Sequence, residues 1–364
     1  MKPKEMPLAG YLLARAAMHK QVDGSALHNL RAGHESVKQV NDLLPFGRAN
    51  VIEDIEKAKD RHPDLYLRHE STVEYRNGLR VMQLYSQMRS RGSAPMEGYH
   101  HRMYAASSQY AGTGVCTSYN TSTTPLHAAK LADMKDKRAI VAQANHQTID
   151  HNWSEMIPKG MREDGTLILD GKDVIMDGWC KENLAVLRED SYFARLDANG
   201  KADHLKHEGF LNHETGPKAL REVEKFKKQI KNSRGLQETY NEYFLERFQY
   251  PKVDSHTFGL WNDTTVFHAD FLERAGNALH KEVKEVKDTE DIRKAGKHAE
   301  VAEDSRKQNV VRNLAEQTKH ASLAEIQAIG VARSLGSNIR DAITEAPGIT
   351  AAAKEMFPRP TRKE

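Results

Sequence analysis

Apolar residues recur at intervals of three and four near both ends of the chain, which is the spacing of amphipathic helices. From Ser25 to Arg89 the members of these stripes are Val37, Val40, Leu44, Tyr75, Leu79, Met82 and Tyr85. Beyond Gly216 and Pro217 they are Leu220, Val223, Phe226, Ile230, Leu272, Ala275, Leu279, Val283 and Val286. Both flanks of the chain are therefore predicted to be helical.

Between Cys116 and Leu196 the pattern changes to short apolar runs separated by turn residues, which is typical of antiparallel strands. Strands are expected at Ala139–Ala144 and His151–Ile157. Asp170-Gly171 is expected to close a hairpin between strands at 166–169 and 173–176, because Asp-Gly suits the positive φ angles of a tight turn. Asn199-Gly200 is a second hairpin candidate, after a strand at 192–196. The fold class predicted from these patterns is α+β.

The same patterns divide the chain into three regions. We expect a helical N-terminal region at 1–92, a mixed core at 93–215 and a helical C-terminal region at 216–364. The first border lies near the loop sequence Arg91–Pro95, which is rich in Gly, Ser and Pro. The segment 280–307 alternates in charge and predicts a solvated helix or connector, and the last residues, from Phe357, are expected to fray.

Composition narrows the class of protein. With 38% hydrophobic and 29% charged residues, a polar chain without a membrane-spanning segment is expected. The net charge of +3 and the lack of a long one-sign block speak against nucleic acid as a partner. Cys116 and Cys180 cannot form a disulfide framework for 364 residues, which favours a reducing compartment. The N-terminus lacks a clean Sec signal, and Lys2 excludes N-myristoylation.

The string Gly112-Thr-Gly-Val-Cys116 is the first candidate for chemistry. Its two glycines allow a sharp turn, and a cysteine that follows them at the start of a helix meets free amide groups and a dipole that favour the thiolate. The residues after Cys116 are rich in Ser, Thr and Asn, which are poor helix formers. The helix is therefore expected to be short and to restart at Thr124, with Pro125 in its first turn.

A base and an acid follow in the sequence. His151 and Trp153 share one face of a strand, so that the indole shields the imidazole from water. Asp177 stands where the apolar run Val174–Met176 ends, and it is suited to orient the imidazole. Nucleophile, base and orienting acid are what a thiol acyl-transfer centre requires. His146, at the end of the neighbouring segment, is the competing base.

Other chemistry is expected to be absent. His100 and His101 with Cys116, His146 and His151 suggest a metal site, but adjacent histidines seldom face one ion and no compact zinc motif accompanies them. The segment 197–208 resembles a calcium loop only faintly, since Ala202 replaces the required Gly and Lys201 replaces a ligand. No metal and no cofactor are predicted.

Two further assignments concern the surroundings of Cys116. The oxyanion donor is expected to be the backbone amide of Cys116, with the side chains of Gln109 and Asn145 as alternatives. Cys180, next to Trp179, is interpreted as a small core hydrophobe.

Gly-x-Cys116, His151-x-Trp and Asp177-Gly-Trp together resemble the transglutaminase-like (papain-like) superfamily, over about residues 105–197. The resemblance implies a nucleophile helix packed on an antiparallel sheet, with Cys116 as nucleophile, His151 as base and Asp177 as orienting acid. In its polar helical flanks and the central position of its triad, the chain resembles the HopX/AvrPphE/XopE family, which are type III effectors of plant-pathogenic bacteria.

This resemblance implies a virulence protein that the bacterium secretes into the host cell. It would act there on a host protein as a cysteine protease, deamidase or transglutaminase, without cofactor or metal. The alternative is a non-catalytic helical binding or scaffold protein with a structural Cys-His-Asp cluster. The sequence leaves open the choice between hydrolysis and amine transfer, the substrate and the oligomeric state.

Overall fold

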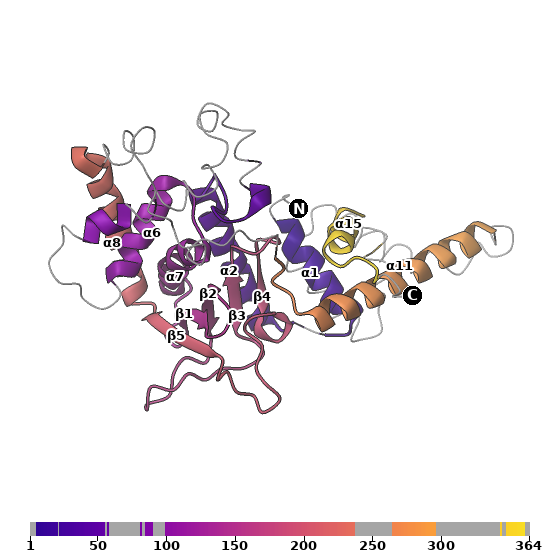
Figure 1. Ribbon diagram of the computed structural model, residues 1–364. Helices are drawn as coiled ribbons and strands as arrows, with labels where there is room; N and C mark the ends of the chain where they lie inside the picture. Colours follow the sequence, from indigo (N-terminus) through magenta and orange to yellow (C-terminus); the bar gives the residue numbers. More distant parts are fainter. Residues whose placement is uncertain are drawn as a thin grey trace. The chain divides into compact units, whose positions relative to one another are not determined.

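The structure is a computed structural model, which describes residues 5–20, 22–54, 57, 81, 84–89, 99–236, 264–295, 343 and 347–360 (Figure 1). The chain divides into two compact units, Met1–Arg31 with Phe267–Glu364, and Ala32–Val266. The second unit holds the whole sheet. The predicted border at Arg91–Pro95 and the stripe residues Tyr75, Leu79 and Met82 lie outside the described residues.

A five-stranded antiparallel sheet forms the centre of the second unit, in the order β4-β3-β2-β1-β5. Its strands are β1 (Ile140–His146), β2 (Asn152–Ile157), β3 (Val174–Asp177), β4 (Leu184–Leu187) and β5 (Leu205–Leu211). Helices and an antiparallel sheet in one unit confirm the α+β class. The strands predicted at Ala139–Ala144 and His151–Ile157 are found as β1 and β2, shifted by one or two residues.

The hairpin predicted at Asp170-Gly171 is wrong. β3 pairs with β2 and β4, and segment 166–169 contributes one isolated bridge, from Leu167 to Met161. Gly171 does not have the positive φ of a tight hairpin turn. Instead Asp170 Oδ1 accepts the backbone N–H of Lys172 at 2.7 Å, and Asp173 Oδ2 accepts that of Asp170 at 2.8 Å, so the carboxylates shape this turn.

The prediction of a second hairpin is confirmed for its turn and wrong for the strand before it. A turn closes at Asn199-Gly200, where Gly200 has φ of 73° and Asp197 N–H donates to Lys201 O at 2.9 Å. The predicted strand at 192–196 is absent, because the Tyr192 N–H donates to Val266 O at 2.8 Å instead of joining the sheet. The turn leads into β5, a largely polar strand that the alternation rule did not reveal. β4 was missed as well, since a four-residue apolar run is ambiguous.

Helices α2 (Gly24–Leu43) and α7 (Cys116–Asp133) cover one face of the sheet. Gly33 of α2 lies so close to Val174 and Met176 that an added Cβ would stand 2.9 and 3.3 Å from their side chains. Met176 is paired in register with Ser154, which bonds to α7, and paired residues share a face. α2 ends at Leu43, two residues before Pro45.

α7 is continuous, so the break expected at Thr124 and Pro125 is wrong. The hydroxyls of Thr121, Thr123 and Thr124 donate to the carbonyls four residues earlier, at 2.7, 2.7 and 3.1 Å. These bonds keep the polar side chains satisfied inside a helix that is buried over most of its length. Burial thus outweighs the weak helix propensity of this segment.

Charged side chains are buried under the other face of the sheet. The Arg188 guanidinium donates to Glu155 and, at 2.9 Å, to Asp173, and all three side chains are fully buried. Burial and the nearby Arg188 lower the pKa of His207 to about 4, so a neutral ring donates to Glu155 at 2.9 Å. These bonds connect β2 and β5 with the residues next to β3 and β4.

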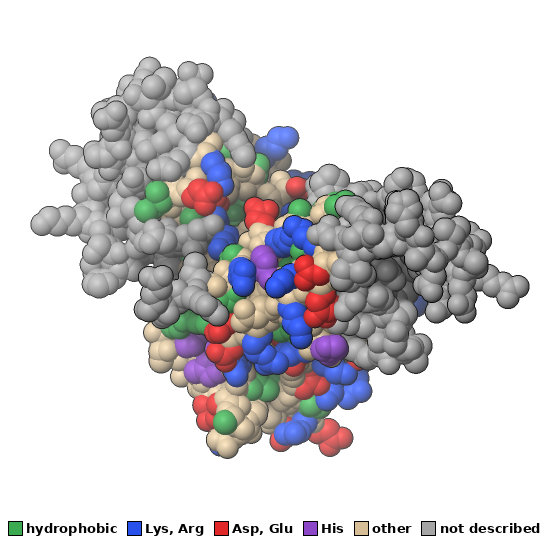
Figure 2. Space-filling view, turned by 90° about the vertical axis from the view of Figure 1, so that its right-hand side faces the viewer, with side chains coloured by type: hydrophobic (Ala, Val, Ile, Leu, Met, Phe, Trp, Pro, Cys, Tyr) green, Lys and Arg blue, Asp and Glu red, His purple; other side chains and the backbone are tan. Residues whose placement is uncertain are grey.

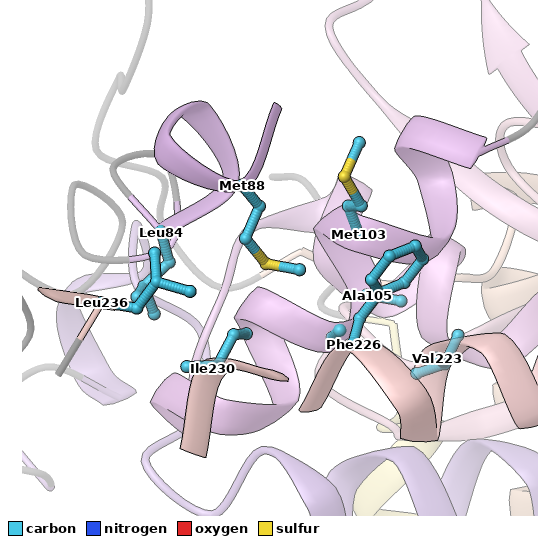
Figure 3. Packing of buried hydrophobic residues seen from close by; sticks show 9 residues of the cluster. Leu84, Met88, Met103, Ala105, Val223, Phe226, Ile230 and Leu236 are labelled. Carbon is cyan, nitrogen blue, oxygen red and sulfur yellow. The ribbon is translucent and has the colours of Figure 1, made fainter. Parts of the chain in front are cut away.

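Helices α6 (Tyr99–Ala111) and α8 (Thr215–Asn232) pack beside α7. Their shared apolar cluster is shown in Figure 3 and consists of Leu84, Met88, Met103, Ala105, Ala106, Val223, Phe226, Ile230 and Leu236. Val223, Phe226 and Ile230 are buried as the spacing predicted, and Leu220 is half-buried. Tyr99 packs edge-on against Phe226, with ring centroids 4.9 Å apart.

The first unit contains helices α1 (Met6–Ala17), α11 (Ala269–Ala295) and α15 (Pro347–Met356). Tyr11, Phe267, Phe271 and Phe357 form its aromatic centre, in which the rings of Phe267 and Phe357 lie 5.0 Å apart. α11 takes up the start of the predicted solvated helix, and the rest of 280–307 lies outside the described residues. Phe357, where fraying was expected to begin, is buried; residues 361–364 are not described.

In the described part of the face shown in Figure 2, acidic and basic side chains are interspersed. Among the described residues, no helix combines the length and the apolar composition needed to cross a membrane.

Replacement of Phe226 by Ala tests the packing of α8. The change empties a buried ring site, so we expect it to lower the free energy of unfolding by about 3–5 kcal/mol. Chemical denaturation measures the loss. The neighbouring exposed Lys225→Ala serves as control and should change stability by less than about 0.5 kcal/mol. Equal effects of the two substitutions would contradict the assigned packing.

Candidate active site

Cys116 is the first residue of α7, as the sequence predicted. Val115 before it is extended, and Gly112 turns the chain with φ of 72°. An added Cβ on Gly114 would stand 2.0 Å from the side chain of Ser118, so this position requires glycine. Ser118 Oγ also accepts the Val115 N–H at 3.2 Å, which ties the loop to the first turn. Cys116 is thereby fixed at the helix N-terminus, 7% exposed.

His151 and Asp177 form a direct pair beside this helix start. Nε2 of His151 lies 2.6 Å from Oδ2 of Asp177, and the two side chains are 1% and 2% exposed. Nδ1 of His151 is buried and has no hydrogen-bond partner among the described residues. The Cys116 thiol is close enough to raise the pKa of His151. The structure therefore brings together the three residues singled out in the sequence.

The charges of this pair follow from its surroundings. Burial by itself would lower the pKa of His151, but the Asp177 carboxylate and, to a smaller degree, Cys116 raise it well above its usual value. Burial would raise the pKa of Asp177, but its interactions with His151, Cys180 and Trp179 hold it below its usual value. Imidazolium and carboxylate are thus the favoured partners.

Aromatic rings enclose His151. The ring centroids of Phe193, Trp179 and Trp153 lie 4.2, 5.1 and 5.8 Å from that of the imidazole. The predicted contact with Trp153 is confirmed, and Trp153 stacks at an interplanar angle of 29°. Phe193 comes from the irregular segment after β4, and no local pattern in the sequence connects it with His151. The enclosure keeps water from the base.

Cys180 belongs to this site. Its Sγ lies 3.2 Å from Oδ2 of Asp177, the same oxygen that contacts His151, while Oδ1 accepts the Trp179 N–H at 3.2 Å. Burial and Asp177 raise the pKa of Cys180, so the thiol remains a donor. The interpretation of Cys180 as a plain core hydrophobe is therefore incomplete. The sequence signal for this contact was that Cys180 follows Asp177 by three residues in a turn.

The ligand atoms of His151, Asp177 and Cys180 lie within 4.8 Å of one another, a set of donors that also suits a metal ion. Two atoms bound to one tetrahedral zinc at ordinary bond lengths stand about 3.3 Å apart. His151 and Asp177 are 2.6 Å apart, the distance of a hydrogen bond with a proton between them. The arrangement fits a proton-linked pair better than a metal site.

His146 occupies different surroundings. Its Nδ1 lies 3.3 and 3.2 Å from the backbone N–H groups of Thr148 and Ile149, and its ring is 5.0 Å from that of His204. An imidazole nitrogen that accepts backbone protons is occupied and is not oriented by an acid. The geometry therefore favours His151 over His146 as the base. His100 and His101, the other histidines of the suggested metal set, contact each other at 5.1 Å between ring centroids.

Asn145 and Gln109, the two side chains expected as alternative oxyanion donors, differ in their hydrogen bonding. The side-chain amide of Asn145 donates to Glu208 at 3.1 Å and is engaged there. Gln109 is buried on α6, and its Oε1 has no hydrogen-bond partner in the described part of the chain. The backbone N–H of Cys116 at the start of α7 remains the default donor.

A polar contact joins the neighbours of Cys116 and His151. The side-chain amide of Asn152 donates to Thr117 Oγ1 at 3.0 Å, and Asn120 donates to Asn152 Oδ1 at 3.3 Å. Thr117 follows Cys116 and Asn152 follows His151, so these bonds set the register of α7 on β2 at the candidate site. The sequence offered only the unusual run of Ser, Thr and Asn after Cys116, which was interpreted as poor helix.

Asp177→Asn tests the electrostatics of the pair. Without the carboxylate, burial dominates and the His151 pKa falls, so the ring loses its proton at lower pH than in the unaltered protein. Titration of the His151 ring by NMR measures the change. The control Asp170→Asn removes a half-buried carboxylate that instead pairs with Lys159. An unchanged His151 pKa in Asp177→Asn would contradict the described pair.

We compared the chain with models of protein families, with curated proteins and with solved structures, and found no significant match in any of the three. The transglutaminase-like and effector resemblances therefore stay predictions from the sequence motifs.

Proposed function

We propose that this protein is a cysteine-dependent enzyme that cleaves amides or transfers acyl groups. Cys116 is the nucleophile, His151 the base and Asp177 the residue that orients His151. The observation that carries the proposal is the buried 2.6 Å contact between His151 and Asp177, with Cys116 at a helix N-terminus and close enough to His151 to raise its pKa.

The chemical steps follow from these positions. The proton of the Cys116 thiol resides on His151, whose charged form the Asp177 carboxylate stabilises, and the thiolate attacks the carbonyl carbon of an amide. Amide groups at the start of α7 stabilise the negative oxygen of the tetrahedral intermediate. The imidazolium then donates its proton to the departing amine or ammonia, which leaves a thioester on Cys116. Attack by water or by a second amine, deprotonated by His151, releases the product and restores the thiol.

The surroundings support each step. Asp177 holds the imidazole in one orientation and stabilises its charged form, and it is itself held by Cys180 and the backbone of Trp179. The rings of Trp153, Trp179 and Phe193 exclude water, which strengthens these electrostatic contacts. The bond between Asn152 and Thr117 keeps base and nucleophile in register.

The proposal extends to a fold family and a biological setting. A helix that begins with the nucleophile and packs on an antiparallel sheet carrying base and acid is the arrangement expected for a transglutaminase-like or papain-like core. The resemblance to HopX/AvrPphE/XopE effectors adds a host protein as substrate and delivery by a bacterium. This second part rests on the sequence motifs alone.

Mass spectrometry of a glutamine-rich acceptor protein, incubated with the protein and a primary amine, separates the possible reactions. An added amine indicates transfer, conversion of glutamine to glutamate indicates deamidation, and a cut chain indicates proteolysis. We expect Cys116→Ala to reduce product formation by about 10³-fold or more. His146→Ala, which changes a histidine outside the triad, should leave it intact.

Product formation that survives in Cys116→Ala would refute Cys116 as the nucleophile. If the protein is a non-catalytic scaffold, folded Cys116→Ala should keep every effect of the unaltered protein in host cells. Loss of these effects together with product formation would support the enzyme.

A further inference from the structure

Segment 46–54, which follows α2, runs beside the loop that precedes Cys116. The backbone N–H of Phe46 donates to Gly112 O and that of Ala49 to Gly114 O, both at 2.9 Å. Thr113 Oγ1 donates to Gly47 O at 2.9 Å. A short backbone ladder thus fixes the loop on which the position of Cys116 depends.

The same segment contacts the turn that carries Asp177. The Arg48 guanidinium donates through Nη1 to the backbone carbonyl of Trp179 at 3.0 Å, and Asn50 Oδ1 accepts the indole N–H of Trp179 at 3.0 Å. Trp179 lies two residues after Asp177 and also donates its N–H to that carboxylate. Segment 46–54 therefore reaches both the nucleophile loop and the acid turn.

Asp54 holds Arg48 in this position. Its carboxylate accepts Nε of Arg48 at 2.7 Å, Nη2 at 2.9 Å and the backbone N–H of Arg48 at 2.9 Å. Burial would raise the pKa of Asp54, but the bonds with Arg48 lower it below its usual value. Gly47 has φ of 76°, and a Cβ there would stand 2.7 Å from Asp54 Oδ2, so the turn leaves no room for a side chain.

We infer that Arg48 is a positioning residue of the candidate active site, which keeps the loop before Cys116 and the turn after Asp177 at a fixed separation. The inference rests on the proposed function. His151 must contact Cys116 with one ring nitrogen and Asp177 with the other, so any change in this separation weakens one of the contacts. A misplacement of about 1 Å is enough to cost about 10²-fold in rate.

The chemistry of arginine suits this role. A planar guanidinium presents donors in a fixed fork, so that two of its nitrogens bind one carboxylate while the third binds a carbonyl. Lysine has a single nitrogen on a flexible stem and cannot make both contacts in the same geometry. Arg48→Lys should therefore restore only part of what Arg48→Ala loses.

The test is the pH profile of Cys116 alkylation by iodoacetamide, read at the Cys116 peptide by mass spectrometry on the full-length protein. We expect Arg48→Ala to move the midpoint of the profile upward, towards that of His151→Ala, and to slow alkylation at neutral pH by about 10- to 100-fold. Arg48→Lys should fall between Arg48→Ala and the unaltered protein. Thermal unfolding confirms that each variant is folded, and Arg48→Lys carries the test if Arg48→Ala does not fold.

Arg138→Ala is the matched control, because exposed Arg138 also donates to a backbone carbonyl, that of Lys159 at 3.2 Å. It should leave the profile unchanged. If His151→Ala shifts the profile but folded Arg48 variants match the unaltered protein, the positioning role is refuted while the proposed function stands. If His151→Ala itself shifts nothing, the proposed function fails and the role of Arg48 fails with it.

Discussion

The hydrogen bond between the buried His151 ring and the Asp177 carboxylate is the interaction on which the rest of the site depends. Charged groups withdrawn from water lose a large solvation energy, so such a pair persists only where further donors offset that loss. Cys180 and the Trp179 backbone supply them on the side of the carboxylate, and Cys116 further raises the pKa of His151. The need for donors to the buried carboxylate explains why the turn after β3 places the Cys180 thiol and the Trp179 N–H beside Asp177.

Successive side chains of β2 make contacts on opposite faces of the sheet. Ser154 faces α7 and bonds to the carbonyl of Asn120, while Glu155 faces the other way and binds the buried Arg188. His207 on β5 and Asp173 before β3 complete that buried polar cluster. Breaking a buried charge pair is strongly destabilising, so these bonds hold β2 and β3 in register. That register in turn sets the distance between His151 and Asp177.

Sequence patterns correctly predicted the structural features that depend on residues close together in the sequence. The stripes of α8 and α11, the strands β1 and β2, and the helix start at Cys116 follow from periodicity and from the glycines at 112 and 114. Two of the failures have non-local causes, because burial keeps α7 intact through Pro125 and Phe193 reaches His151 only in the folded chain. The failure at Asp170-Gly171 is local, since the carboxylates of Asp170 and Asp173 shape that turn. Arg48 was not singled out in the sequence, because its side chain reaches the carbonyl of Trp179, which lies 131 positions further along the chain.

Catalysis at this site requires a thiolate at Cys116 that His151 stabilises. The ultraviolet absorbance of the thiolate, recorded against pH as the difference between the unaltered protein and Cys116→Ser, tests this most directly. We predict that the thiolate signal persists to lower pH with His151 than in His151→Ala, because a protonated imidazole beside the sulfur favours its charged form. A difference signal that depends on pH in the same way with and without His151 would contradict the assignment of Cys116 and His151 as a catalytic pair.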